Sequence, residues 1–171
     1  MTSNLLSKNE YPDIYSIYID LMPNAHLIEE LEISLHDFIR FVQNIPLDKF
    51  DFRYSEEKWT IKEIIQHLID TERILSYRTL RIARNDKTVL HGFDQNEYVK
   101  NANSNTRSIQ DLLTELSAVR HSTLYLFKSF KEEQLLNIGN AVGYDFSVRA
   151  IGFIIIGHMK HHQKIFKERY L

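Results

Sequence analysis

The stretch GFIIIGHMKHHQKIF, residues 152–166, decides the fold, because it joins an apolar run to three closely spaced histidines. The apolar residues recur at helical spacing from Ser147 onward, which predicts a helix with one buried stripe. Residues four apart stack on one face of a helix, so His158 and His162 point the same way while His161 lies to one side. Two aligned imidazoles on a buried stripe are either half of a metal site or an accident of composition.

Apolar side chains recur every three or four residues in three further segments, 24–43, 60–84 and 108–130, which predicts three more long helices. Asn24 is expected to cap the first of these, and Thr60 with Glu63 matches the capping-box pattern at the start of the second. The apolar residues of 85–106 show no regular spacing, so a long connection is predicted between the second and third helices. Residues 131–146 predict a short helical turn followed by a polar, glycine-bearing connection.

Composition supports one all-α domain over residues 1–171, built as a four-helix bundle with that long connection. The chain has only five glycines and three prolines, which disfavours a turn-rich all-β fold. Its 21 basic and 23 acidic residues give a net charge of -2, so no broad basic field favours nucleic acid or an anionic membrane. No apolar run of membrane-spanning length and no signal-peptide pattern is present, so a cytoplasmic protein is expected.

The histidines are the strongest candidates for chemistry. The chain has no cysteine, which excludes thiolate ligands and a cysteine nucleophile. Neutral imidazole binds zinc, nickel and iron, and His67 on the predicted second helix offers a third ligand beside His158 and His162. Three such ligands leave a coordination position open, which indicates chemistry, although a lone histidine on an apolar face is more often a hydrogen-bonded core residue. The other histidines are expected on the surface or in the long connection: His26, His36, His91 and His121.

Four segments carry a resemblance to a known family: YIDLMP (18–23), KWTIKEIIQHLIDTERI (58–74), GFDQNEYV (92–99) and SVRAIGFIIIGHMKHHQKIFKERYL (147–171). With them the chain resembles the DinB superfamily, in particular its DinB-like and YfiT-like four-helix-bundle proteins. The histidine of HLIDTE and the first and last histidines of HxxHH are the metal ligands in that family, which implies His67, His158 and His162 here. The resemblance further implies a divalent metal, usually nickel or zinc, frequently a homodimer, and no DNA binding.

The resemblance implies a small-molecule substrate and leaves the activity open. Family members include S-transferases that use a low-molecular-weight thiol such as bacillithiol or mycothiol, a mycothiol-dependent maleylpyruvate isomerase, and proteins described as metal-dependent hydrolases without a demonstrated substrate. Our first hypothesis is a thiol S-transferase, because a thiol bound to a divalent metal is deprotonated. The first alternative is hydrolysis by water that the metal activates. The second is a metal-binding protein without catalytic activity, for which a protein carboxylate in the fourth position would be evidence.

Hydrolysis needs a base or proton shuttle near the metal, and Glu63 and Asp70 flank His67 at helical spacing. Asp70 could instead orient His67 as a hydrogen-bond partner, and either carboxylate could simply pair with Lys62 or Arg73. Three residues of the long connection, His91, Asp94 and Tyr98, could overhang the metal and contact substrate, although such residues more often satisfy only their own turns.

Overall fold

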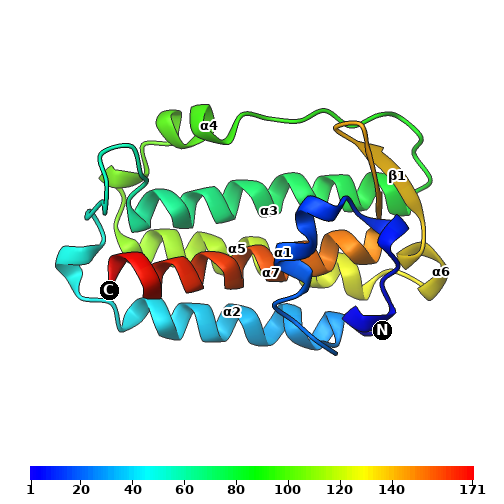
Figure 1. Cartoon of the computed structure of the whole chain (residues 1–171), viewed down its shortest axis with the longest axis horizontal. Helices are drawn as coiled ribbons and strands as arrows, with labels where there is room; N and C mark the ends of the chain where they lie inside the picture. The colour runs from blue at the N-terminus through cyan, green and yellow to red at the C-terminus, as the bar shows by residue number, and fades with distance from the viewer.

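Four long helices form the body of the protein (Figure 1). The computed structural model describes all residues, 1–171. The helices are α2 (Leu27–Gln43), α3 (Ile61–Ala83), α5 (Ile109–Lys128) and α7 (Val148–Ile165). Both α2 and α3 pack against α5 and α7, so α2 and α3 lie diagonally across the bundle although they are consecutive long helices. The predicted all-α four-helix bundle is confirmed. None of its helices is both long and apolar enough to cross a membrane.

Shorter elements surround the bundle. They are α1 (Ser16–Ile19), α4 (Gln95–Asn101), α6 (Glu132–Leu135), a π-helical turn after α7 (Phe166–Tyr170), and five 3-10 turns (Ser3–Leu5, Lys8–Glu10, Asp13–Tyr15, Leu47–Lys49, Ser104–Thr106). Helix α1 packs against α7, and α4 packs against α3. The predicted long connection between α3 and α5 is present, and it runs along the outer side of α3 with α4 near its end (Figure 1).

Side-chain caps fix where three of the long helices begin. The capping box predicted at the start of α3 is present: Thr60 Oγ1 accepts a hydrogen bond from the Glu63 amide at 3.1 Å, and Glu63 Oε2 accepts one from the Thr60 amide at 2.7 Å. Ser108 caps α5 and Ser147 caps α7 in the same way, each through its hydroxyl group. These bonds satisfy amides that have no partner within a helix.

The expected cap of α2 is wrong. The helix begins at Leu27, and His26 rather than Asn24 occupies the position before it. Asn24 follows Pro23 in a turn and has a φ of 62°, in the left-handed region that asparagine tolerates better than most residues. Its preference for turns therefore overrides its preference for helix starts.

A β-hairpin stands where an irregular connection was expected before α7. Strand β1 (Ile138–Ala141) pairs antiparallel with β2 (Tyr144–Ser147). Val142 and Gly143 form the turn with φ values of 56° and 80°, the signs that a two-residue hairpin turn requires. Leu90 of the long connection pairs with the hairpin, because its amide donates to the Asn140 carbonyl group at 3.0 Å. The hairpin thus holds the start of the connection in place.

A charged network crosses the buried interior of the bundle. Arg120 of α5 is fully buried, and its Nε and Nη2 donate to the carboxylate of Glu72 on α3 at 2.8 and 2.9 Å. Its Nη1 donates to Ser34 Oγ and the Leu31 carbonyl oxygen of α2, at 2.9 and 3.0 Å. A buried charge is tolerated when it is paired and hydrogen-bonded, as here. This network ties α2, α3 and α5 together.

Candidate metal centre

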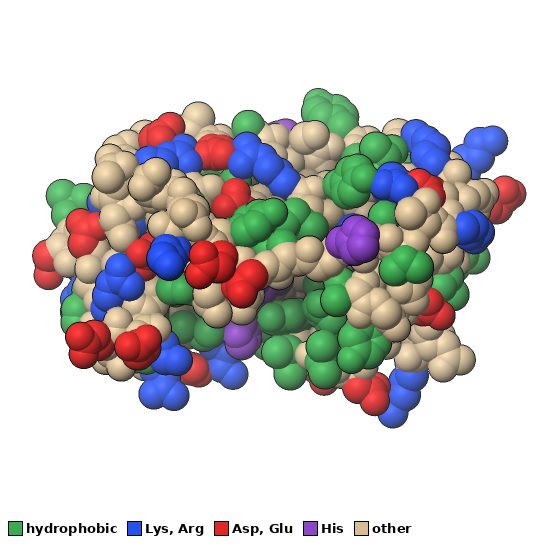
Figure 2. Space-filling view, turned by 90° about the horizontal axis from the view of Figure 1, so that it is seen from above, with side chains coloured by type: hydrophobic (Ala, Val, Ile, Leu, Met, Phe, Trp, Pro, Cys, Tyr) green, Lys and Arg blue, Asp and Glu red, His purple; other side chains and the backbone are tan.

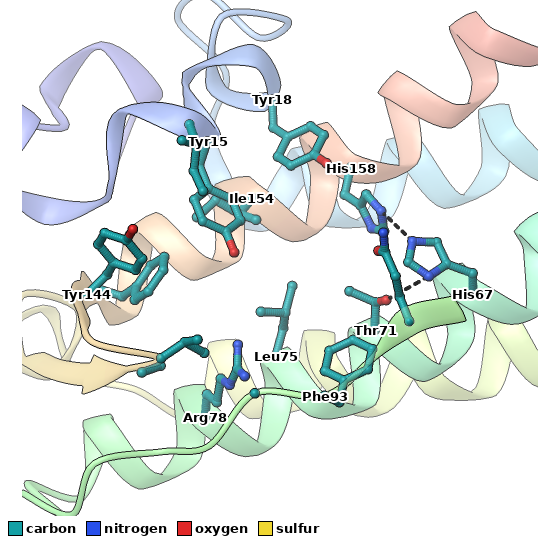
Figure 3. A pocket seen from close by; sticks show the side chains of 16 residues that line it. Tyr15, Tyr18, His67, Thr71, Leu75, Arg78, Phe93, Tyr144, Ile154 and His158 are labelled. Carbon is teal, nitrogen blue, oxygen red and sulfur yellow. Dashed lines mark hydrogen bonds between the residues drawn. The ribbon is translucent and has the colours of Figure 1, made fainter. Parts of the chain in front are cut away.

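Helices α3 and α7 bring His67, His158 and His162 together. Figure 3 shows the first two of these side chains. His158 Nε2 lies 3.0 Å from His67 Nε2 and 3.0 Å from His162 Nε2. The three ligand atoms lie within 4.8 Å of one another, and the group contains no carboxylate. His67 and His158 are buried, and His162 is partly buried. The three residues that the sequence singled out therefore form one cluster.

Hydrogen bonding within the protein cannot satisfy this cluster. An imidazole nitrogen carries either one N–H or one lone pair in the ring plane, so His158 Nε2 can bond to only one of its two neighbours. His162 Nδ1 is also buried without a hydrogen-bond partner. A cation that accepts a lone pair from each Nε2 atom would give all three Nε2 atoms a partner at once. Two nitrogens bound to one tetrahedral zinc ion lie about 3.3 Å apart, which is close to the separations found here.

Burial keeps the three imidazoles neutral. It lowers the pKa of His67 from 6.5 to about 4. Burial also holds the pKa of His158 and of His162 well below 6.5, and the neighbouring histidines lower both further. Only the neutral ring has a lone pair to offer, so at neutral pH all three rings are ready to act as ligands.

Two contacts hold the ring of His67 from the side of α3. The indole ring of Trp59 packs against it, with ring centroids 4.9 Å apart. Thr71, one turn along α3, places its hydroxyl oxygen 3.4 Å from His67 Nδ1. Tyr170 donates a hydrogen bond to the Trp59 carbonyl oxygen at 2.5 Å, so the π-helical turn at the end of the chain supports the wall behind His67.

On the other side, Tyr18 of α1 packs against α7. Its ring lies edge-on to those of both His158 and His161, with centroids 5.4 Å apart in each case. Gly157 allows this approach, because a Cβ atom at that position would lie 2.6 Å from the Tyr18 carbonyl carbon and 2.7 Å from its Cβ. Glycine at position 157, directly before His158, therefore allows α1 to pack closely against α7.

A cavity of about 290 Å³ opens beside the cluster (Figure 3). His67 and His158 lie at one end of it, and Arg78 of α3 lies toward the other. Most of its wall is apolar or aromatic: Ile14, Tyr15, Tyr18, Leu75, Phe93, Ala141, Val142, Tyr144, Phe146 and Ile154. Viewed over α3 and α4, the surface is hollowed near its centre, with hydrophobic side chains at the border and charges of both signs toward the two ends (Figure 2).

A second cavity, of about 210 Å³, reaches the cluster through His162. Its wall includes Trp59 and Tyr170, together with Asn96 of α4. His67 and His158 line the first cavity and His162 lines the second, so the cluster is accessible from two separate hollows.

The structure places the two predicted catalytic carboxylates in other contacts. Glu63 caps α3 and also accepts hydrogen bonds from Arg53 and Asn105, at 2.8 Å each. Asp70 accepts a hydrogen bond from the Gln66 side chain at 3.0 Å, and burial raises its pKa. Asp70 lines an open hollow beside α4 that contains none of the three histidines. Their catalytic roles stay predictions.

The long connection covers the first cavity through residues other than those expected. Gly92, Phe93 and Gln95 line the cavity, whereas the Asp94 carboxylate caps α4 by accepting bonds from the Asn96 and Glu97 amides. His91 contributes its carbonyl oxygen to Arg78. Five cavity residues were not predicted from the sequence: Tyr15, Tyr18, Arg78, Phe93 and Tyr144. The expected positions of four histidines, on the surface or in the long connection, are confirmed, since all four are exposed: His26, His36, His91 and His121.

These observations agree with comparisons with known proteins. The chain belongs to the DinB superfamily, whose family model matches residues 30–166. No curated protein matches the sequence. The segment before residue 30, which supplies Tyr15 and Tyr18 to the cavity, lies outside the matched region.

Three solved structures share the fold. YfiT from Bacillus subtilis, described as a probable metal-dependent hydrolase with an unusual four-helix bundle topology, aligns with a TM-score of 0.75 at 16% identity, over 83% of this chain and 82% of that one. A mycothiol-dependent maleylpyruvate isomerase aligns with a TM-score of 0.66 at 12% identity, over 81% and 58% of the two chains. A DinB-like protein, YjoA, from Bacillus subtilis aligns with a TM-score of 0.56 at 15% identity, over 81% and 84%.

Proposed function

We propose that this protein is a metal-dependent S-transferase that joins a low-molecular-weight thiol to an electrophilic small molecule. His67, His158 and His162 would hold one divalent cation, nickel or zinc. The observation that carries the proposal is the convergence of three neutral imidazole nitrogens on one point, in a group without a carboxylate. Fold relatives support a small-molecule reaction, since one is described as mycothiol-dependent and another as a probable metal-dependent hydrolase.

The donor set suits a thiol as the activated group. When bound, a divalent cation held by three neutral ligands keeps its full charge and favours the thiolate form of a thiol near neutral pH. The protein has no cysteine, so the thiol must come from a substrate. The two cavities that meet at the histidines offer separate places for the thiol and for the electrophile.

The protein residues supply position and a dry environment. Trp59 and Thr71 hold the ring of His67, and Tyr18 holds that of His158, so the ligand atoms are oriented before any substrate arrives. The apolar wall of the larger cavity limits water around the reacting sulfur. In the reaction the sulfur forms a bond to the electrophilic carbon, the thiol proton leaves to solvent, and the leaving group departs with the electron pair of its broken bond.

Activity with a fluorogenic electrophile tests this proposal. Protein loaded with nickel or with zinc is mixed with monochlorobimane and, in turn, bacillithiol, mycothiol or glutathione. We expect faster formation of the thioether and of chloride than without protein. His158→Ala should lose this acceleration. His121→Ala removes an exposed histidine of α5 and should keep it. Equal rates with and without protein for every thiol would refute the S-transferase proposal.

Hydrolysis is the second candidate, and it is supported by the three-histidine group together with the description of the fold relative YfiT as a probable metal-dependent hydrolase. In this version Asp70 or Glu63 would take a proton from water. A panel of esters, amides and phosphoesters tests it, with Asp70→Asn and Glu63→Gln as the decisive variants. If both variants still hydrolyse the substrate, neither carboxylate takes part in the mechanism. If the protein hydrolyses a substrate but shows no thiol transfer, hydrolysis replaces S-transfer as the function.

Two further expectations from the sequence stay proposals. We propose a homodimer, which light scattering on the eluting protein tests directly through its mass. We also propose a cytoplasmic location, which fractionation of the source cells tests.

A further inference from the structure

Arg78 is a buried arginine whose charge the protein leaves unpaired. Only 5% of the residue is exposed, and burial lowers the pKa of its guanidinium group. It donates one hydrogen bond, from Nη2 to the carbonyl oxygen of His91 at 2.7 Å, and no carboxylate pairs with it. Its Nε is buried without any hydrogen-bond partner. A guanidinium group has five N–H donors, so most of its capacity is unused.

The other buried arginine shows what a structural role requires. Arg120 has a carboxylate, a hydroxyl group and a carbonyl group as partners, and both its Nε and Nη2 are bonded to Glu72. An unpaired buried charge costs free energy that a protein does not recover from its own contacts. A ligand of opposite charge would recover it at Arg78.

Arg78 points into the cavity that ends at the histidines (Figure 3). His67, Thr71, Leu75 and Arg78 follow one face of α3, and all four line this cavity. Arg78 lies eleven positions after His67, which is about 16 Å along the helix axis. Tyr15 lines the same cavity as Arg78, and its side chain also points into it (Figure 3).

We propose that Arg78 anchors the anionic end of the ligand that occupies this cavity. The ligand is a small molecule with an apolar middle and a terminal carboxylate or phosphate group, whose other end reaches His67 and His158. The guanidinium fork matches the two oxygens of a carboxylate or phosphate, and Tyr15 adds a hydroxyl donor. The cavity volume, about 290 Å³, suits a small substrate. The reactive role of the other end rests on the function proposed above, whereas binding at Arg78 does not.

Direct binding tests this anchor without catalysis. The full-length, metal-free protein is titrated with hydrocinnamate, with its neutral amide hydrocinnamamide, and with phenyl phosphate, and binding is followed by calorimetry. The variants are Arg78→Met, which keeps a long side chain without charge, and Arg78→Lys, which keeps the charge without the fork. Arg84→Met, at the exposed end of the same helix, is the matched control.

We expect hydrocinnamate to bind at least about tenfold more tightly than its amide. Arg78→Met should abolish that preference, Arg78→Lys should weaken it, and Arg84→Met should leave it unchanged. Tighter binding of phenyl phosphate than of hydrocinnamate would identify phosphate as the anionic group of the natural ligand.

Equal binding of acid and amide, or a preference that survives in Arg78→Met, would overturn the proposal. If Arg78→Met does not fold, Arg78→Lys tests the proposal instead. Full retention of the preference for hydrocinnamate over its amide in Arg78→Lys would exclude bidentate recognition by the guanidinium group. Because the assay uses neither metal nor thiol, failure of the S-transferase reaction would leave its result standing.

Discussion

Replacing Gly157 with alanine tests how closely α1 is packed against the candidate metal centre. The new Cβ atom would lie 2.6 Å from the Tyr18 carbonyl carbon and 2.7 Å from its Cβ, whereas carbon atoms in contact are usually about 3.5–4.0 Å apart. Helix α1 must therefore move outward by about 1 Å. Overpacking of this kind costs about 1–3 kcal/mol. Alanine also stabilises a helix by about 0.5–1 kcal/mol relative to glycine, which offsets part of this cost. Taking the middle of each range, the net loss is about 1 kcal/mol.

For a chain of this length, that loss lowers Tm by about 2–4 °C. Gly152→Ala is the matched control in the same helix, because its Cβ would meet only the side chains of Leu27 and Phe127, at 2.8 Å each. Both variants should lose stability in thermal unfolding followed by circular dichroism. Only Gly157→Ala should speed amide hydrogen exchange in residues 16–20, because only that variant displaces α1. A Gly157→Ala protein as stable as the parent, with unchanged exchange in α1, would refute this account of the packing.

Three further outcomes follow from contacts around the site. In the metal-free protein the folded-state pKa of His67 is about 4 against an ordinary 6.5, so the unfolded chain takes up the proton first as the pH falls. Stability is full above pH 6.5 and should fall by up to about 3 kcal/mol as the pH drops to 4. Urea unfolding measures this loss, and His67→Gln should reduce it. Tyr170→Phe removes the hydrogen bond to the Trp59 carbonyl group and should cost about 1 kcal/mol in the same assay, without changing the amount of metal bound. Glu72→Ala leaves the Arg120 charge buried and unpaired, so the free energy of unfolding should drop by about 3–5 kcal/mol. An unchanged free energy of unfolding would show that water reaches this network.

Periodicity in the sequence predicted the bundle because each long helix buries one continuous stripe. The stripe of α5, for example, runs through Leu112, Leu116, Val119 and Thr123, all of which are buried. The metal-ligand candidates were equally visible, since histidines at helical spacing on a buried stripe interrupt an apolar pattern. What periodicity cannot supply is the arrangement of the helices, and the diagonal placement of α2 and α3 had no signal in any single segment.

The cavity wall was missed for a related reason. Tyr18 and Tyr144 come from segments more than a hundred residues apart, and only the folded chain brings both beside α3. The hairpin escaped prediction because Val142 occupies a left-handed position where asparagine, aspartate or glycine is usual. Arg78 had a weak signal, since it continues the face of His67 and Leu75, but an arginine on a helix is usually solvated. Its unpaired state is visible only in the structure.

The metal content of the protein tests the central claim most directly. Protein purified without a histidine tag is dialysed against nickel or zinc at low concentration, and the bound metal is measured by inductively coupled plasma mass spectrometry. We expect a single tightly bound ion per chain, and an affinity lower by at least about 100-fold when His67, His158 or His162 is replaced by alanine. A chain that binds no ion, or that binds as much metal after His158→Ala as before, would contradict the account.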